Sequence, residues 1–278
     1  MVKTKVLITV KTYPSLSVKY DELVCTAGFT EQGNWIRIYP IPFRKKSYEQ
    51  RYKKYDWIEI DLVKNQEDKR PESYRPASIN AEIKRIGHLD TSNNWKERKQ
   101  ICLKKVYTNM KQLIGEAKNP SICTSLAVFK PRQIIDFTFE PVEPEWDKEK
   151  LNQILAKRSQ LDMFEAEDIQ EFNLVNKLPY KFYYHFKDEN GKKSKLMVED
   201  WELGMLYWNC LEKSKGDKEK ALEKVKQKCF EEFVETKDLY FFLGTTKAYH
   251  WKARNPFIIV GLFYPKLNEE ASDRPTLF

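Results

Sequence analysis

The stretch of residues 22–44, ELVCTAGFTEQGNWIRIYPIPFR, constrains the fold more than any other part of the chain. Two runs in it, residues 23–29 and 35–39, are rich in apolar, β-branched or aromatic side chains, as β-strands are. The polar residues between them include Gly33, which can take the positive φ that a tight turn requires. Two prolines follow the second run and are expected to end regular pairing, because proline has no N–H to donate. The stretch therefore predicts a β-hairpin.

Neighbouring segments indicate that this hairpin belongs to a larger β-structure. Residues 5–11 are β-branched, and residues 55–63 alternate apolar with acidic side chains, which is the period of a half-buried strand. Further strands are predicted at residues 79–88, 121–130 and 133–139. A stretch rich in Lys, Glu and Gln at residues 94–118 predicts one inserted helix. The N-terminal part is therefore predicted to be a small barrel or a curled antiparallel sheet.

A proline-punctuated acidic segment, residues 140–146, predicts a domain boundary, and Asp147 then caps a predicted helix. The predicted elements beyond it are a hairpin at 180–198, helices at 199–211 and 217–235, and buried strands at 239–243 and 257–263. We therefore predict an α+β fold in three parts. These are a β-rich domain at 1–140, a helical linker at 141–177, and an α+β domain with a mixed or antiparallel sheet at 178–278.

The composition favours a packed protein with a polyanionic partner. Hydrophobic residues make up 41% of the 278 residues, enough for a folded core. The formal net charge of +8 favours polyanions, although a solvated basic surface is the alternative explanation. The five cysteines show no CxxC pair and the three histidines are scattered, so we expect neither a metal site nor a cofactor.

The same features bear on location. Free thiols fit a reducing compartment. The apolar run near the N-terminus is too short for a signal peptide, and no stretch approaches the ~18 apolar residues of a membrane span. We therefore expect a cytoplasmic protein with no membrane partner.

The segments LITVKTYP and VCTAGFTEQGNWIRIYP together resemble the opening of the bacterial dual OB-domain family. The residues that match the family pattern are Cys25, Gly28, Gly33, Trp35 and Arg37. The resemblance covers roughly the first forty residues, and the chain departs from the family pattern after that. It implies that the N-terminal domain is an OB-like barrel that binds oligonucleotides.

Cations and rings interleave at the end of the hairpin and in the loops that follow it. Arginine can contact phosphate and stack on bases, while aromatic rings stack on bases of any sequence. The candidate nucleic-acid-binding residues are Arg37, Tyr39, Phe43, Arg44, Lys45, Lys46, Arg51, Lys53, Arg70 and Arg75. The alternative is that the rings belong to the core and the lysines to a solvated face.

A second candidate lies between the two predicted buried strands near the C-terminus, where loops often hold ligands. It consists of Gly244, Thr245, Thr246, Lys247 and His250, whose hydroxyls and cation suit a phosphate group. The GxxxxGK[ST] spacing of a nucleotide-binding P-loop is absent. The alternative is a tight turn whose hydroxyls satisfy its own backbone.

The predicted linker contains a short motif, Gln160, Leu161, Asp162, Met163 and Phe164, that resembles the pentapeptide by which bacterial proteins bind the replication sliding clamp. Leu161, Met163 and Phe164 would fill an apolar cleft of the clamp. The alternative is a segment that packs on this protein's own core.

These features support three hypotheses. The first is a DNA- or RNA-binding protein that acts in replication or repair, or in a mobile-element or defence locus, the last extending the family resemblance. The second is a nucleotide sensor, or an enzyme that modifies nucleotides or nucleic acid, with its pocket near residues 244–250. The third is an interaction scaffold. We assign no catalytic residue, because no Ser-His-Asp or Cys-His order is visible.

Overall fold

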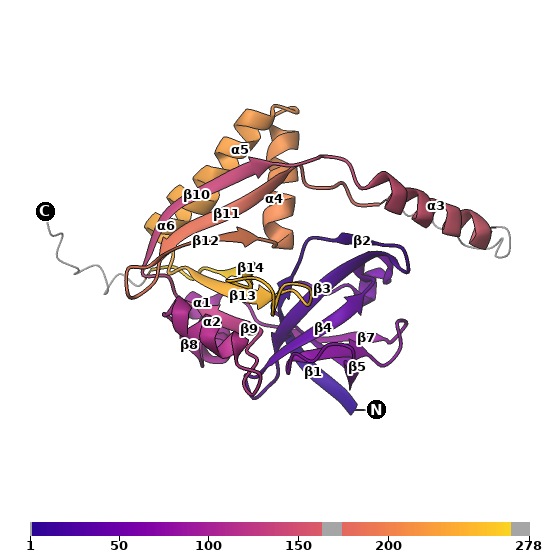
Figure 1. Cartoon of the computed structure of the whole chain (residues 1–278), viewed down its shortest axis with the longest axis horizontal. Coiled ribbons are helices and arrows are strands. Elements are labelled where there is room, and N and C mark those ends of the chain that lie inside the picture. The colour runs from indigo at the N-terminus through magenta and orange to yellow at the C-terminus, as the bar shows by residue number, and fades with distance from the viewer. Residues whose placement is uncertain (1, 163–173, 268–278) are drawn as a thin grey trace, which may run out of the picture. The chain divides into compact units, whose positions relative to one another are not determined.

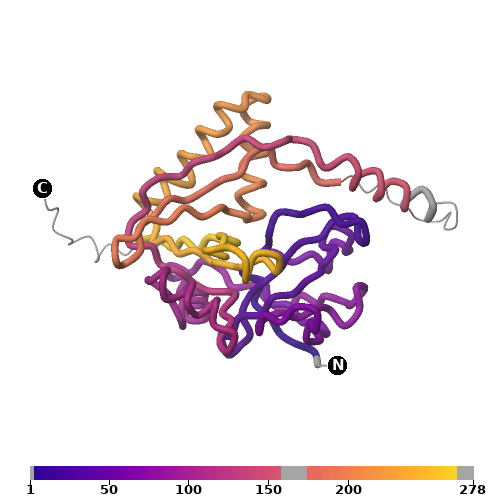
Figure 2. Tube along the Cα trace, in the orientation of Figure 1, coloured from indigo at the N-terminus to yellow at the C-terminus, as the bar shows by residue number. Residues whose placement is uncertain are grey.

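The computed structural model describes residues 2–162 and 174–267 and divides the chain into two compact units (Figures 1 and 2). The first unit comprises Met1–Leu89 and Phe139–Lys181, and the second comprises Asp90–Thr138 and Phe182–Phe278. The chain is therefore α+β, with a barrel in its N-terminal region and a second sheet with helices.

Five strands of the first unit close into a barrel. They are β1 (Val2–Lys11), β3 (Asp21–Phe29), β4 (Trp35–Ile41), β6 (Ser73–Pro76) and β5 (Asp56–Lys64). Closure follows because β1 pairs with both β3 and β5. All neighbours are antiparallel except β4 and β6, which are parallel. Two short strands extend the sheet: β2 (Ser15–Ser17) beside β3 and β7 (Ile83–His88) beside β5.

The predicted hairpin is confirmed. Strands β3 and β4 pair with Phe29 opposite Trp35, and Gly33 takes φ +84° in the turn between them. One detail of the prediction is wrong, because β4 continues through Pro40 to Ile41, which pairs with Val24. The register shifts at this point, and the bulge accommodates the proline.

Alternating burial along β5 confirms its predicted period of two, since Ile58, Ile60 and Leu62 are buried while Glu59 and Asp61 are half-buried. Two 3-10 turns, Phe43–Lys45 and Tyr48–Gln50, connect β4 to β5. The predicted helix that begins at Asp147 is α3 (Lys148–Asp162), and the Asp147 carboxylate accepts a hydrogen bond from the Lys150 N–H.

The sheet of the second unit has the order β10-β11-β12-β14-β13-β9-β8. These strands are β8 (Val106–Tyr107), β9 (Leu126–Phe129), β10 (Gln133–Pro141), β11 (Tyr180–Lys187), β12 (Lys193–Val198), β13 (Tyr240–Thr245) and β14 (Phe257–Phe263). The sheet is mixed, because β8–β9 and β12–β14 are parallel and the other registered pairs are antiparallel.

Helices accompany this sheet (Figure 1). They are α1 (Ser92–Cys102), α2 (Met110–Lys118), α4 (Trp201–Lys213), α5 (Lys218–Lys226), a π-helical turn (Gln227–Glu232) and α6 (Phe233–Thr236). The single helix predicted at 94–118 is wrong. Strand β8 interrupts it, and α2 starts afresh because the Asn109 side chain accepts a hydrogen bond from the Gln112 N–H.

The units differ from the sequence-based boundaries. Residues 90–138 are predicted from the sequence to belong with the N-terminal barrel, whereas in the structure they belong to the second unit. Strand β9 explains the difference, because it pairs with β13 more than a hundred residues away in sequence. No helix within the described ranges is long and apolar enough to cross a membrane.

Candidate nucleic-acid interface

Arg37 was predicted to face outward from the hairpin, and this prediction is wrong. Only 3% of the residue is exposed, and its guanidinium donates to the Ser73 hydroxyl at 3.2 Å. Burial, together with the nearby Arg70, lowers the pKa of Arg37. The backbone N–H of Arg37 also donates to the Glu72 carbonyl. Arg37 is therefore held inside the first unit by Ser73, the first residue of β6, and by Glu72 directly before it.

Arg70 belongs to the same buried group. It donates to both carboxylate oxygens of Asp68, at 2.8 and 2.5 Å, and Ser73 donates to that carboxylate at 2.9 Å. Although burial alone would raise it, the hydrogen bonds from Arg70 and Ser73 lower the pKa of Asp68 to about 2. The prediction that Arg70 contacts nucleic acid is therefore wrong for the same reason as that for Arg37, because its charge is compensated inside the fold.

Cations of the segment that follows β4 are also engaged. Arg44 donates to both oxygens of buried Glu22, at 2.7 and 2.8 Å, and Lys45 pairs with buried Asp21. Lys46 donates to two backbone oxygens, and burial lowers its pKa. Arg51 donates to the backbone oxygens of Lys46 and Arg44. Arg44 and Lys45 therefore tie the 3-10 segment to β3, Lys46 ties it to the stretch before β7, and Arg51 bonds within the segment itself.

The remaining barrel candidates divide between core and surface. Phe43 is buried and packs edge-on against Tyr52, with ring centroids 4.8 Å apart. Tyr39, Lys53 and Arg75 are exposed. Five of the ten predicted contact residues are therefore exposed, and two of these five, Lys45 and Arg51, are engaged in the contacts described above.

A second group of rings and cations lies in the connection between β13 and β14. Its exposed members are Lys247, Tyr249, Trp251, Lys252 and Arg254. Tyr249 is 62% exposed and Trp251 is 50% exposed, which is unusual for side chains of this size. Backbone bonds from the His250 N–H to the Thr246 oxygen and from the Ala253 N–H to the Tyr249 oxygen give the segment a fixed path. We call residues 246–254 the aromatic loop.

His250 anchors this loop. It is buried, one ring nitrogen lies 2.8 Å from the Thr245 hydroxyl, and the other lies 3.4 Å from the Cys123 sulfur. The Lys118 ammonium donates to the backbone oxygen of His250. The Trp251 ring stands edge-on to the imidazole with centroids 4.6 Å apart. His250 is thus buried between two exposed neighbours, Tyr249 and Trp251.

The five residues predicted to line a pocket at 244–250 are separated by this arrangement. Gly244, Thr245 and His250 are buried, Thr246 is half-buried, and Lys247 is exposed. A Cβ on Gly244 would lie 3.1 Å from the Val260 side chain, so Gly244 packs against β14 and not against a ligand. The Thr245 hydroxyl bonds to the His250 ring, and the Thr246 hydroxyl is buried without a hydrogen-bond partner among the described residues, so the segment does not match the alternative of a turn whose hydroxyls all satisfy its own backbone.

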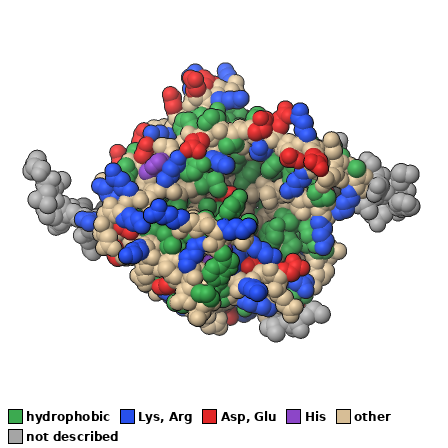
Figure 3. Space-filling model, viewed as in Figure 1, with side chains coloured by type: hydrophobic (Ala, Val, Ile, Leu, Met, Phe, Trp, Pro, Cys, Tyr) green, Lys and Arg blue, Asp and Glu red, His purple; other side chains and the backbone are tan. Residues whose placement is uncertain are grey.

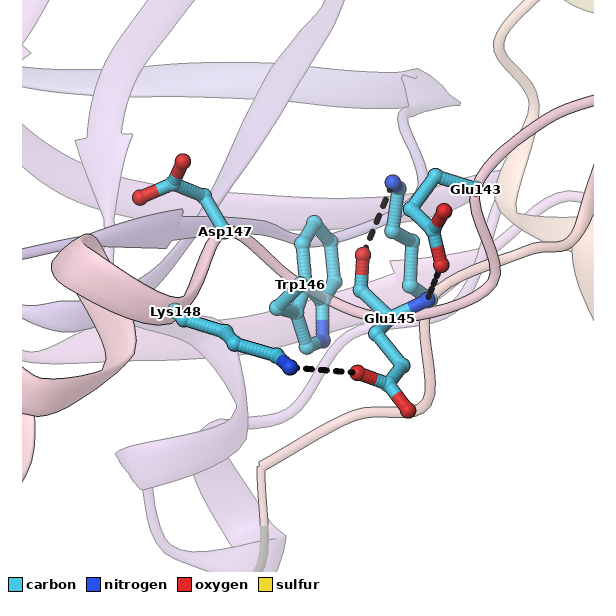
Figure 4. Close-up of a pocket in the computed structure, with 6 residues that line it drawn as sticks. Glu143, Glu145, Trp146, Asp147 and Lys148 are labelled. Carbon is cyan, nitrogen blue, oxygen red and sulfur yellow. Dashed lines mark hydrogen bonds and ion pairs between the residues drawn. The ribbon is translucent and has the colours of Figure 1, made fainter.

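A surface depression of about 400 Å³ lies in the first unit. Glu143, Glu145, Trp146, Asp147, Lys148 and Lys177 line it. Figure 4 shows the Lys148 side chain reaching toward Glu145, and Lys177 donates to the Glu145 backbone oxygen. The Trp146 indole donates to the Val175 carbonyl at 2.8 Å. With three carboxylates against two ammonium groups, this depression does not suit a polyanion.

Two other predictions touch the described residues only in part. Gln160, Leu161 and Asp162 are the last residues of α3, while Met163 and Phe164 lie outside the described residues. The clamp-binding peptide therefore stays a prediction. Within residues 2–162 and 174–267, no group of three or more His, Cys, Asp or Glu side chains is arranged to hold a metal ion.

Sequence reasoning missed Tyr249, Trp251 and Cys123. The signal for the first two was present, because rings and cations alternate in KAYHWKAR in the same way as in the barrel segment. Cys123 carried no such signal. It lies 127 residues before His250, and only the pairing of β9 with β13 brings the two together.

Two family models match the chain. "Domain of unknown function (DUF8758)" matches residues 2–104, and "Domain of unknown function (DUF8757)" matches residues 106–277. The second match covers more than half of the sequence, so the chain belongs to the DUF8757 family. No curated protein matches the chain. The border between the two matches falls between α1 and β8, whereas the two compact units divide at Leu89.

Proposed function

We propose that the protein binds single-stranded nucleic acid, DNA or RNA, through the aromatic loop. The observation that carries the proposal is the exposure of Tyr249 and Trp251 beside three exposed cations, Lys247, Lys252 and Arg254. Aromatic rings that stack on bases and cations that contact phosphates are the two parts of a single-strand binding surface.

The anchoring of the loop supports this proposal. Burying a large ring contributes about 1.5–3 kcal/mol to folding, so two exposed rings on a fixed backbone leave that free energy unused in the free protein. Stacking on a base contributes about 1–3 kcal/mol per ring. Since buried His250 already fixes the backbone between the rings, the ordering entropy lost on binding is reduced.

Net charge alone would not identify the site. On the face shown in Figure 3, Lys and Arg side chains are dispersed among hydrophobic and acidic ones. The positive balance of +8 raises the general attraction to polyanions, while the rings of the aromatic loop supply a place where a strand can be held.

We further propose that the N-terminal barrel is OB-like. The barrel has five strands in the order β1-β3-β4-β6-β5, in which β6 precedes β5 although it follows β5 in the chain. This Greek-key order supports the proposal, because the OB-fold is a five-stranded Greek-key barrel. Exposed Tyr39, Lys53 and Arg75 are the barrel residues that would contact the strand. Arg37 and Arg70 stabilise the barrel from within.

The stacking prediction is tested with a fluorescent single-stranded oligonucleotide titrated with the full chain. We expect Trp251→Ala and Tyr249→Ala each to weaken binding by about 10-fold, corresponding to about 1.4 kcal/mol. The matched control is Tyr48→Ala in the first unit, since Tyr48 is 76% exposed and lies outside the loop. The Tyr48 variant should bind with the affinity of the parent protein. The proposal fails if the loop variants also bind with that affinity, or if the parent protein does not bind.

The charge prediction uses the salt dependence of the same titration. Replacing Lys252 and Arg254 by Gln should reduce the slope of log K against log salt by about 1.4, because each phosphate contact on a single strand contributes about 0.7. The control pair is Lys213→Gln with Lys218→Gln, two exposed lysines elsewhere in the second unit. An equal change of slope in both pairs would show that the loop cations act only through net charge.

A further inference from the structure

His250 of the aromatic loop forms a thiol–imidazole pair with Cys123 in the second unit. Cys123 Sγ is 3.4 Å from His250 Nε2. The backbone brings the two together: the Thr245 N–H donates to the Ser125 carbonyl at 3.0 Å, and Gly244 pairs with Leu126 where β13 meets β9. Both residues lie in the segments that adjoin the paired strands β9 and β13, and the pairing of these two strands brings the segments together.

A hydroxyl on its far side orients the imidazole. His250 Nδ1 is 2.8 Å from Thr245 Oγ1. When Nδ1 carries the proton and donates it to that hydroxyl, Nε2 presents a lone pair to the thiol. A nucleophile, a base within hydrogen-bond reach, and a third group that orients the base form the arrangement found around activated nucleophiles.

The backbone at Cys123 is also unusual, a property that it shares with six other non-glycine residues of the described chain. Its φ is +50°, in the left-handed region that a residue with a Cβ rarely adopts. Strain of this kind concentrates at functional sites. The turn is held by the Cys123 N–H, which donates to the Asn119 oxygen at 2.7 Å. Cys123 retains 7% exposure, directly after exposed Ile122.

The other cysteines differ in their surroundings and not in exposure alone, since Cys210 is 8% exposed. Burial raises the pKa of Cys102, Cys210 and Cys229, which keeps those thiols protonated and unreactive. Cys25 is half-buried in the barrel and is more exposed than Cys123. Exposure alone would therefore make Cys25 the most reactive thiol, and a faster reaction at Cys123 would need a chemical cause.

We propose that Cys123 is a nucleophilic thiol that attacks small carbon electrophiles, with His250 as its base. The S–H bond breaks and its proton passes to His250 Nε2. The sulfur lone pair forms the S–C bond, and the bond from that carbon to its leaving group breaks, so that the leaving group departs with the electron pair. The imidazolium then returns its proton to solvent. This site does not depend on whether the aromatic loop binds nucleic acid.

Charged groups on neighbouring elements adjoin the pair. From α2, Lys118 donates to the His250 backbone oxygen, and Glu116 accepts from the Thr124 hydroxyl at 3.3 Å. From β8, the Tyr107 hydroxyl donates to the same Glu116 carboxylate. Lys247 and Lys252 flank His250 on its own loop. The Glu116 carboxylate is engaged by two hydroxyls, and the Lys118 ammonium is bound to the loop backbone. The His250 imidazole is therefore the base nearest the thiol.

The test is alkylation of the full chain by iodoacetamide, in which iodide is the leaving group, with the labelled cysteine identified by peptide mass spectrometry. At neutral pH we expect Cys123 to react about 10-fold faster than Cys25, which serves as the internal control. His250→Asn keeps a polar group near Thr245 but removes Nε2, and it should slow Cys123 by about 10-fold or more while leaving Cys25 unchanged.

The pH profile separates activation from mere access. In the parent protein the rate at Cys123 should level off below the ordinary thiol pKa of about 8.5, whereas in His250→Asn it should still rise through that value. If the Thr245 hydroxyl positions the imidazole ring, Thr245→Val should shift the pH profile of Cys123 in the same direction as His250→Asn does. The proposal is overturned if Cys123 reacts no faster than Cys25, or if its pH profile is the same in all three proteins. Thr245→Val provides the comparison should His250→Asn fail to fold.

Discussion

Replacing Gly28 by alanine is expected to prevent the barrel of the first unit from closing. A Cβ at this position would overlap the carbonyl oxygen of Leu7 and lie 2.8 Å from the Leu7 carbonyl carbon and 3.1 Å from Ile8 Cα. All three atoms are backbone atoms of β1, where Ile8 pairs with Gly28 itself. Since no side-chain rotation relieves the overlap, we expect the free energy of unfolding to fall by about 3 kcal/mol or more.

The matched control is Gly115→Ala in α2. Nothing lies within 4 Å of the Cβ that this change adds, so alanine should be neutral or stabilise the helix by up to about 1 kcal/mol. Urea unfolding followed by circular dichroism compares the two variants with the parent protein. If Gly28→Ala unfolds at the same urea concentration as Gly115→Ala, the close approach of β1 and β3 is not as described.

Local patterns predicted the elements whose partners are near in sequence. The hairpin of β3 and β4 needed only the alternation of its strands and Gly33, and α3 needed only its cap at Asp147. Strand β9 could not be placed in the same way, because its apolar run fits either sheet and its partner β13 lies far along the chain. Periodicity reports which residues are buried, but not which strand covers them.

The candidate site shows the same limit at the level of single residues. On β4, Ile36 and Ile38 are buried as the alternation predicts, and Arg37 between them should then face solvent. It is buried because β6 provides Ser73 as its strand partner, and the segment before β6 provides Asp68 nearby. In the aromatic loop, by contrast, exposure was predictable only once the burial of His250 was known.

The buried charges of the first unit provide the second large effect. Asp68→Asn removes the carboxylate that accepts from Arg70 and Ser73, and leaves the guanidinium groups of Arg70 and Arg37 buried with less compensation. Breaking a buried ion pair by removing one partner costs about 3–5 kcal/mol, and we expect a loss of this size in urea unfolding. Arg75→Gln, which changes an exposed cation near the same segment, should cost less than about 0.5 kcal/mol.

The loss of stability caused by Asp68→Asn should also depend on pH. The pKa of Asp68 is lowered in the folded protein from its ordinary 3.8 to about 2, so its carboxylate contributes stability above pH 3.8. That contribution is lost as the pH falls from 3.8 toward about 2, because the folded protein must then take up the proton that the unfolded chain has already bound. The difference in stability between the parent protein and Asp68→Asn should therefore shrink across this range. A difference that stays constant with pH would mean that the Asp68 carboxylate is not stabilised by Arg70 and Ser73 as described.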